Sequence, residues 1–149
     1  MAWSTPKTDW YGYTNATGDY TGDRFNANDF NRIKNNLSYL RDLAVELYPS
    51  FSINNLGSDR VYSDFGPYAD EINDLEENLV TINTNTLNRD YGEAPYTYAE
   101  NGYTMDFNEL NRLESAILDL YDRLQNQYNG RRMLTFKLGV PNDGYLHGM

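Results

Sequence analysis

Apolar residues recur at alternating steps of three and four in three separate stretches of the chain. This spacing places them on one face of an α-helix, where they can be buried together. In the first stretch Asn26 or Asn28 can cap the helix N-terminus and Pro49 cannot continue the helix, so the pattern predicts a helix at about 27–48. Its apolar positions are Phe30, Ile33, Leu37, Leu40, Ala44 and Leu47.

The second and third stretches carry the same pattern with their own start and stop signals. Pro67 stands where a first-turn proline costs no hydrogen bond, and the second pattern fades near residue 84. Asp106 and Glu109 have the spacing of an N-cap residue and its N3 partner, and Gly130 is a natural stop for the third helix. The apolar positions are Ile72, Leu75, Leu79 and Ile82, then Leu110, Leu113, Ile117, Leu120 and Leu124.

One helical sequence motif, which we name the phrase, occurs three times in the chain. It reads "DFNRIKNNL" from residue 29, "EINDLEENL" from residue 71 and "ELNRLESAI" from residue 109. The phrases therefore recur about every 40 residues, with one helix in each unit. The fold that this predicts is mainly α, a three-helix bundle of repeated phrases, with helices at about 27–48, 67–84 and 106–129.

Each phrase places an asparagine, Asn31, Asn73 or Asn111, beside its first core position. Asparagine is a poor residue for a helix interior unless its amide has hydrogen-bond partners. The interpretation that we favour is that each amide binds the incoming loop and fixes its path. In the alternative, the three amides meet between helices or subunits and specify the helix register.

The segments between the phrases are long and rich in aromatic residues. They include "PSFSINNLGSDRVYSDFG" and "NTNTLNRDYGEAPYTYAENGY", and connections of this length are usually functional or disordered. Near the end, "MLTFKLGV" alternates Leu134, Phe136 and Leu138 with polar residues, which predicts a short C-terminal β segment that needs another edge to pair with. The predicted organisation is an aromatic N-terminal arm (1–25), a three-helix domain (26–130), and a C-terminal strand and tail (131–149).

Charge and composition limit the classes of partner. The chain of 149 residues has 22 acidic and 12 basic residues, a net charge of −10, and its one basic doublet is Arg131-Arg132, so binding to nucleic acid is not expected. Cysteine is absent, which excludes disulfides and thiolate catalysis. No stretch approaches the length of an apolar membrane span and the N-terminus does not read as a secretion signal, so we expect a soluble protein made in the cytoplasm.

The sequence offers no pattern for catalysis or for a bound cofactor. Phosphate-binding and dinucleotide-binding motifs are absent, and the single histidine, His147, has no nucleophile motif beside it. "DYTGDRFNAND" and "PNDGYLHG" contain oxygen ligands but do not match the calcium-loop pattern. We therefore predict no catalytic residue, no cofactor and no metal site.

Aromatic residues cluster near the N-terminus. Their rings could stack on sugars, or they could form a belt that the arm lays over the helix bundle or a neighbouring subunit, and we favour the belt. With the predicted C-terminal strand they form the candidate interface, which comprises Trp3, Trp10, Tyr11, Tyr13, Tyr20, Leu134, Phe136 and Leu138.

"WSTPKTDW" followed by "DRFNANDFNRIKNNLSYLRDLA" resembles the N-terminal region of structural proteins encoded in the tail gene clusters of phages and prophages of Gram-positive bacteria. In those proteins a "PKTDW" arm precedes a stretch like "FN..D.NRI..N...L", and the resemblance covers about the first 45 residues. It implies a virion component of the tail tip, baseplate or fibre apparatus, made in the host bacterial cytoplasm and present in several copies. It implies no catalytic residue.

We therefore expect a non-enzymatic virion structural protein that acts through protein–protein contacts. Its expected partners are further copies of itself, with three-fold or six-fold symmetry favoured by the resemblance, and other tail proteins. Contacts between copies are expected mainly in residues 3–25 and 131–146, because the arm and the lone strand have surface to cover. The alternative is a carbohydrate-binding module for bacterial surface glycans, and a third hypothesis is a hydrolase of cell-wall polymers.

Overall fold

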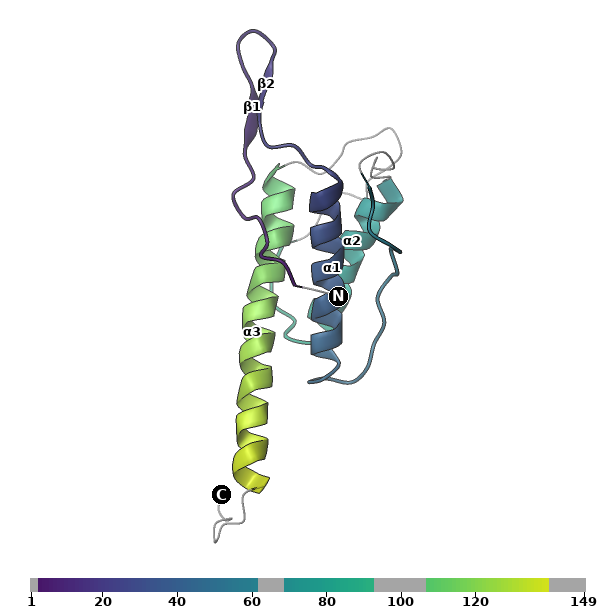
Figure 1. Cartoon of the computed structure of the whole chain (residues 1–149), viewed down its shortest axis with the longest axis vertical. Helices are drawn as coiled ribbons and strands as arrows, with labels where there is room; N and C mark the ends of the chain where they lie inside the picture. Colours follow the sequence, from purple (N-terminus) through teal and green to yellow (C-terminus); the bar gives the residue numbers. More distant parts are fainter. Residues whose placement is uncertain (1–2, 62–68, 93–106, 140–149) are drawn as a thin grey trace.

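The computed structural model describes residues 3–61, 69–92 and 107–139, which form three helices and one small sheet (Figure 1). Each helical phrase lies in its own helix, so the predicted mainly helical, three-helix fold is confirmed. In chain order the elements are β1 (Gly12–Thr14), β2 (Tyr20–Gly22), α1 (Ala27–Ala44), α2 (Ala69–Thr84) and α3 (Phe107–Gly139).

The three helices lie side by side and run in the same direction (Figure 1). Parallel helices need connections that travel back along the helix, and α1, with 18 residues, is about 27 Å long. The connections 45–68 and 85–106 are long enough for this return. The length of the segments between the phrases therefore follows from the parallel arrangement.

Helix α1 begins with a capping box. The backbone N–H of Asp29 donates to Asn26 Oδ1, and the backbone N–H of Asn26 donates to Asp29 Oδ2. The helix ends at Ala44, before the predicted end at 48, and a turn follows in which the Tyr48 N–H donates to the Ala44 carbonyl. This turn still carries Leu47 into the core.

The predicted C-terminal strand is wrong, because α3 continues through Gly130 to Gly139. A lone strand needs a partner edge for its backbone groups, whereas a helix satisfies them within the segment. Alternation over a short apolar run does not distinguish the two. The side chains of Leu134, Phe136 and Leu138 lie outside the described residues. The strands that the structure describes, β1 and β2, pair as an antiparallel hairpin within the N-terminal arm.

The core confirms the three apolar patterns. Every apolar position predicted from the spacing is buried. Four further apolar residues that the helical pattern did not include are buried with them, Trp10, Ala27, Leu43 and Ala116. The periodicity thus identified the inward face of each helix. Trp10 reaches the core from the N-terminal segment, so the core is completed by residues outside the helices.

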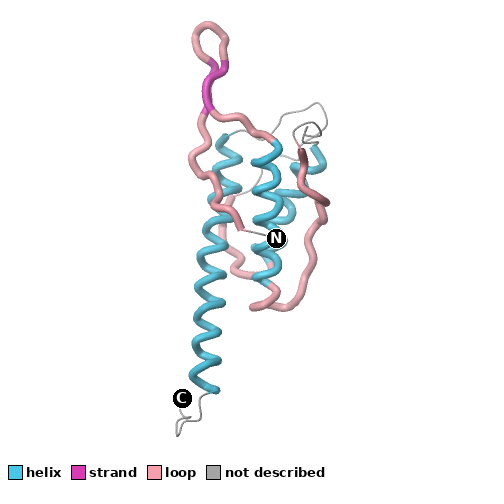
Figure 2. The backbone as a smooth tube through the Cα atoms, in the orientation of Figure 1, coloured by secondary structure: helices cyan, strands magenta, loops and turns pink. Residues whose placement is uncertain are grey.

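Two extended segments lie along the helices, residues 3–10 (the docked segment) and residues 51–60 (the return segment); Figure 2 shows both as loops beside the helices. Asparagine side chains hold them by a contact that we name an amide clip. In a clip, Oδ1 accepts from the N–H of one residue and Nδ2 donates to the carbonyl of that same residue. The clips are Asn36 with Ser4, Asn111 with Trp10, Asn78 with Asn54 and Asn31 with Arg60.

The clips show what the phrase asparagines contact. Asn31 and Asn111 bind backbone of the passing segments, which is the contact that the loop-binding interpretation describes. Asn73 also has an interaction partner. Asn83 makes a further clip to Arg89 just beyond the end of α2. Within the described residues, the extended segments have no neighbouring strand to pair with. The asparagine amide takes the place of a strand and satisfies the backbone N–H and carbonyl of one residue of the segment.

Replacing the buried Asn78 with Ala should lower the free energy of unfolding by about 1–3 kcal/mol, because the backbone N–H and carbonyl of Asn54 lose their partners. Urea denaturation followed by circular dichroism measures this change. The control is Asn126→Ala on the exposed face of α3, which should change stability by less than about 0.5 kcal/mol. Equal effects of the two substitutions would show that the clip contributes nothing.

Candidate functional site

The groove between α1 and α3 holds the docked segment and is the most elaborate contact between distant parts of the described chain. Three backbone N–H groups of the segment, those of Ser4, Lys7 and Trp10, donate to helix side chains. The acceptors are Asn36 Oδ1 at 2.9 Å, Glu114 Oε1 at 3.0 Å and Asn111 Oδ1 at 2.8 Å. The period of three residues is that of a polyproline II segment, which has no internal hydrogen bonds and exposes its backbone to partners.

The return segment repeats this arrangement between α1 and α2. Its residues Asn54, Gly57 and Arg60 contact helix side chains at the same interval of three. Asn54 and Arg60 are held by clips, and the Gly57 carbonyl accepts from Lys34 Nζ at 3.1 Å. The internal repeat therefore includes an extended segment as well as a helix.

Two tryptophans anchor the docked segment. Trp3 stacks on Tyr121 of α3, with ring centroids 3.9 Å apart and planes 8° apart. Trp10 is only 4% exposed, stacks on Phe107 and donates its Nε1–H to Glu114 Oε2 at 2.6 Å. Large buried aromatic residues contribute much of the energy of such contacts. Of the candidate interface, these two residues face the chain's own bundle.

Glu114 is the centre of the groove. Its side chain is 0% exposed, and its two oxygens accept four hydrogen bonds, from the Lys7 N–H, the Trp10 indole, and Nε and Nη2 of Arg32. The two bonds from Arg32 form a bidentate pair at 2.8 and 2.7 Å. A buried carboxylate is tolerated only with such complete pairing.

Arg32 is itself held between two carboxylates. Its Nη1 donates to Asp29 at 2.9 Å while its other two contacts go to Glu114. Burial alone would lower the pKa of Arg32, but the hydrogen bonds and charge of Glu114, and then those of Asp29, outweigh burial and raise it. The guanidinium is therefore permanently charged and acts as the counter-ion of the groove rather than as a proton donor.

A similar pair joins α3 to α2. Arg112 occupies the phrase position of Arg32, and it contacts Glu76 of α2 and, at 2.9 Å, Glu109. Burial raises the pKa of Glu76, and the charge and hydrogen bond of Arg112 counteract part of that rise. Two of the three helix junctions thus place an arginine of one helix beside a buried glutamate of the next.

The third junction, between α1 and α2, has the opposite charges at the two phrase positions. Asp74 of α2 stands at the position of the arginine, and Lys34 of α1 stands at the position of the glutamate. Lys34 is buried and its Nζ contacts Asp59 at 2.9 Å, together with Asn35 and the Gly57 carbonyl. Lys34 is a hydrogen-bond donor, so it binds the backbone carbonyl of Gly57 in the return segment. Glu114 is an acceptor, so at the same phrase position it binds the backbone N–H of Lys7 in the docked segment.

Asp59→Asn should remove a small stabilisation that depends on pH. The hydrogen bond from Lys34, and then that from Asn35, lowers the pKa of Asp59 below its ordinary value. This contribution is therefore present above the ordinary aspartate pKa and is lost as the pH falls through the lowered one. Urea denaturation should find wild type more stable than the variant near pH 7 by less than about 1 kcal/mol, since the Asp59 side chain is 60% exposed. The difference should shrink toward about pH 2, and a difference that grows there would contradict the assignment.

The β1–β2 hairpin stands off the helical bundle (Figure 1). It presents Tyr11, 63% exposed, and Tyr13, 48% exposed, with ring centroids 5.8 Å apart. At the turn, Asn15 Oδ1 accepts from the Thr17 and Asp19 N–H groups. Gly22 has φ +124° and a Cβ there would lie 2.4 Å from Gly12 Cα, so only glycine fits. The Tyr20 side chain lies outside the described residues.

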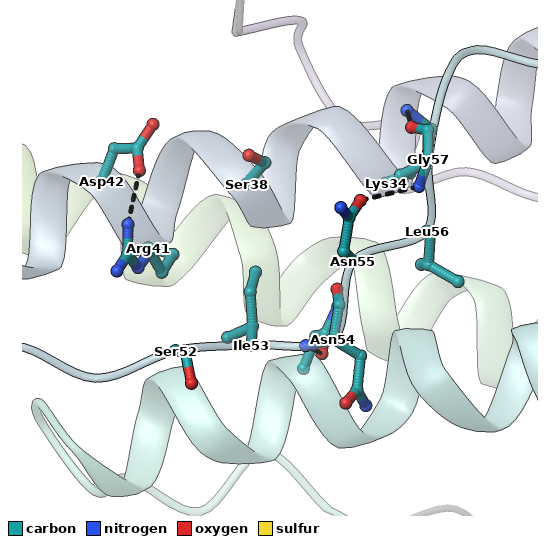
Figure 3. A pocket seen from close by; sticks show the side chains of 11 residues that line it. Lys34, Ser38, Arg41, Asp42, Ser52, Ile53, Asn54, Asn55, Leu56 and Gly57 are labelled. Carbon is teal, nitrogen blue, oxygen red and sulfur yellow. Dashed lines mark hydrogen bonds and ion pairs between the residues drawn. The ribbon is translucent and has the colours of Figure 1, made fainter.

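A polar pocket opens between α1 and the return segment (Figure 3). Its volume is about 390 Å³, and Lys34, Ser38 and Arg41 of α1 face residues 52–57 across it. Arg41 is fixed by a bond from Nε to the Phe51 carbonyl at 2.9 Å. None of the described residues that line the pocket is aromatic, so it lacks the stacking surface on which sugar rings usually bind.

Part of the groove is predictable from the sequence. Trp3, Trp10 and the acceptor Asn111 are among the predicted site residues, whereas the acceptors Glu114 and Asn36 are not. A signal for Asn36 was present, because Asn78 stands at the same position of the second phrase. The same kind of signal was present for Glu114, because Glu76 stands at the same position of the second phrase. A glutamate on a helix usually faces solvent, however, so this signal did not point to burial.

Among the described residues, no cluster of histidine, aspartate or glutamate could hold a metal ion, and no helix is long and apolar enough to cross a membrane. Comparison with protein-family models, curated proteins and solved structures found no match to this chain.

Proposed function

We propose that the chain is a non-enzymatic structural protein of a phage or prophage virion, located in the tail, baseplate or fibre-attachment region. The observation that carries the proposal is that the two motifs of the resemblance form one contact. Ser4 of "WSTPKTDW" binds Asn36 of "NRIKNNL", and the Trp10 ring lies 6.0 Å from Arg32 of the same stretch. The resemblance therefore covers the extended segment and α1, one of the two helices that hold it.

The use of charged side chains supports the same proposal. Among the described residues the buried charged groups are Lys34, Glu76 and Glu114, and each is paired with a counter-ion from another element. Such pairing fixes the arrangement of helices and segments. The exposed aromatic residues of the hairpin are suited to contact with other proteins.

Mass spectrometry of purified virions from the parent phage or induced prophage tests the proposal. The protein should be found in particles at a copy number that is a multiple of three or six, as the favoured symmetry requires. Electron microscopy of the same particles should locate it in the tail region. Its absence from particles would overturn the proposal.

Glycan binding is a second candidate, favoured by the exposed Tyr11 and Tyr13 beside the polar hairpin turn. Trp3 and Trp10 are engaged by Tyr121 and Glu114, so among the described residues the hairpin tyrosines offer the exposed rings that a sugar could reach. On a glycan array the wild-type chain should then bind bacterial surface glycans, and Tyr11→Ala with Tyr13→Ala should abolish binding. If the wild-type chain binds no glycan, this candidate is lost.

A further inference from the structure

We propose that the groove between α1 and α3 is a receptor for the docked segment of a second copy of this chain, so that copies assemble by exchanging residues 3–10. This deepens the proposed structural function and rests on it for the biological setting. The contacts that hold the segment are noncovalent and join helix side chains to segment backbone and rings. They are the same whichever copy supplies the segment, which makes exchange nearly neutral in contact energy.

The connection between the segment and α1 permits this exchange. Residues 11–26 contain the hairpin, whose strands have three residues each. A two-stranded hairpin of this size is marginally stable in water. Once opened, residues 11–26 could span about 50 Å. That distance exceeds the length of α1, about 27 Å, so the segment can leave its own groove and reach a neighbour.

The return segment shows why the docked segment is the one that exchanges. Both are held by clips at the same interval. The return segment is joined to α1 by residues 45–50, whereas the docked segment is joined to α1 by the longer stretch 11–26, which contains the hairpin. The longer connection favours residues 3–10 as the segment that exchanges.

Photo-crosslinking of the full chain tests the exchange directly. Copies with benzoylphenylalanine in place of Trp3 are made in ordinary and in ¹⁵N-labelled form, unfolded together, refolded at high concentration and irradiated. Trp3 lies against Tyr121 and Tyr39, so crosslinks should join position 3 to peptides containing these residues. Exchange predicts crosslinked peptides that pair an ordinary with a labelled partner. Crosslinks found only within one isotope would overturn the proposal.

A pair of complementary variants provides a second test. The first copy carries Trp3→Ala and Trp10→Ala and keeps its groove, while the second carries Asn36→Ala and Asn111→Ala and keeps its segment. A native segment and a native groove then meet only between different copies. Native mass spectrometry should find a 1:1 complex at least about 30-fold tighter than self-association of either copy, as expected for a buried tryptophan anchor.

The matched control replaces the second copy's Trp3 and Trp10 with Ala as well, which should abolish the complex. No complex between copies that circular dichroism shows to be folded would overturn the proposal. If a variant fails to fold, the crosslinking experiment decides, because it changes one aromatic residue for another. Absence from virions would instead overturn the proposed function and leave segment exchange as a property of the purified chain.

Discussion

Glu114→Ala is expected to lower the free energy of unfolding by about 3–5 kcal/mol, because it breaks a buried ion pair and leaves Arg32 without its main counter-ion. The substitution also removes the acceptor of the Trp10 indole and of the Lys7 N–H. Unpaired buried groups of this kind account for the largest effects of single substitutions. Urea denaturation monitored by circular dichroism measures the loss.

The control for Glu114→Ala is Asp122→Ala, which removes an exposed carboxylate from the same helix and should change stability by less than about 0.5 kcal/mol. A double variant, Glu114→Leu with Arg32→Met, removes both charges and should recover much of the loss, since an apolar pair can replace a buried ion pair. A loss below about 1 kcal/mol for Glu114→Ala would show that the groove is not stabilised by this network.

Trp10→Ala is expected to lower the free energy of unfolding by about 3–5 kcal/mol, the usual cost of truncating a buried large aromatic residue. The ring packs against Phe25 and Phe107, and its removal leaves a cavity and takes one of the four hydrogen bonds from Glu114, whose Oε2 keeps the bond from Arg32 Nη2. Because the substitution changes tryptophan fluorescence directly, urea denaturation should be followed by far-ultraviolet circular dichroism.

Tyr11→Ala is the matched control for Trp10→Ala, because the neighbouring ring is exposed on the hairpin. Its effect should stay within about 0.5 kcal/mol. If the two substitutions had equal effects, residue 10 would not be the anchor of the docked segment. If Trp10→Ala unfolded the protein completely, Trp10→Phe should restore folding, since it keeps an aromatic ring in the core and loses the bond to Glu114 and part of the indole's volume.

The repeat of the phrase also explains how charge is distributed over the bundle. At two helix junctions the same two phrase positions hold an ion pair, Arg32 with Glu114 and Arg112 with Glu76. At the third junction the charges at these positions are reversed, with Asp74 in place of the arginine and Lys34 in place of the glutamate. Lys34 is neutralised there by Asp59 of the return segment. The segments therefore contribute counter-charges as well as backbone contacts. A chain with a net charge of −10 can in this way keep its buried groups paired.

The sequence by itself determined the existence of three helices and their buried faces. Phe30, Leu75 and Leu113 could be assigned to the core because helix periodicity and burial are local, and every such position is buried. Asn26 and Asp29 likewise form a capping box through residues three apart. Such features need no knowledge of the rest of the chain.

Only the tertiary structure decided the direction of the helices, the paths of the segments and the partners of buried charges. Arg32 and Glu114 are 82 residues apart, and no local pattern specifies that they meet. The end of α3 was misassigned because the apolar run around Phe136 fits either a helix or a strand when its surroundings are unknown. For the paths of the segments and the partners of buried charges, the deciding energy comes from burial and hydrogen bonding between distant segments, which local sequence does not record.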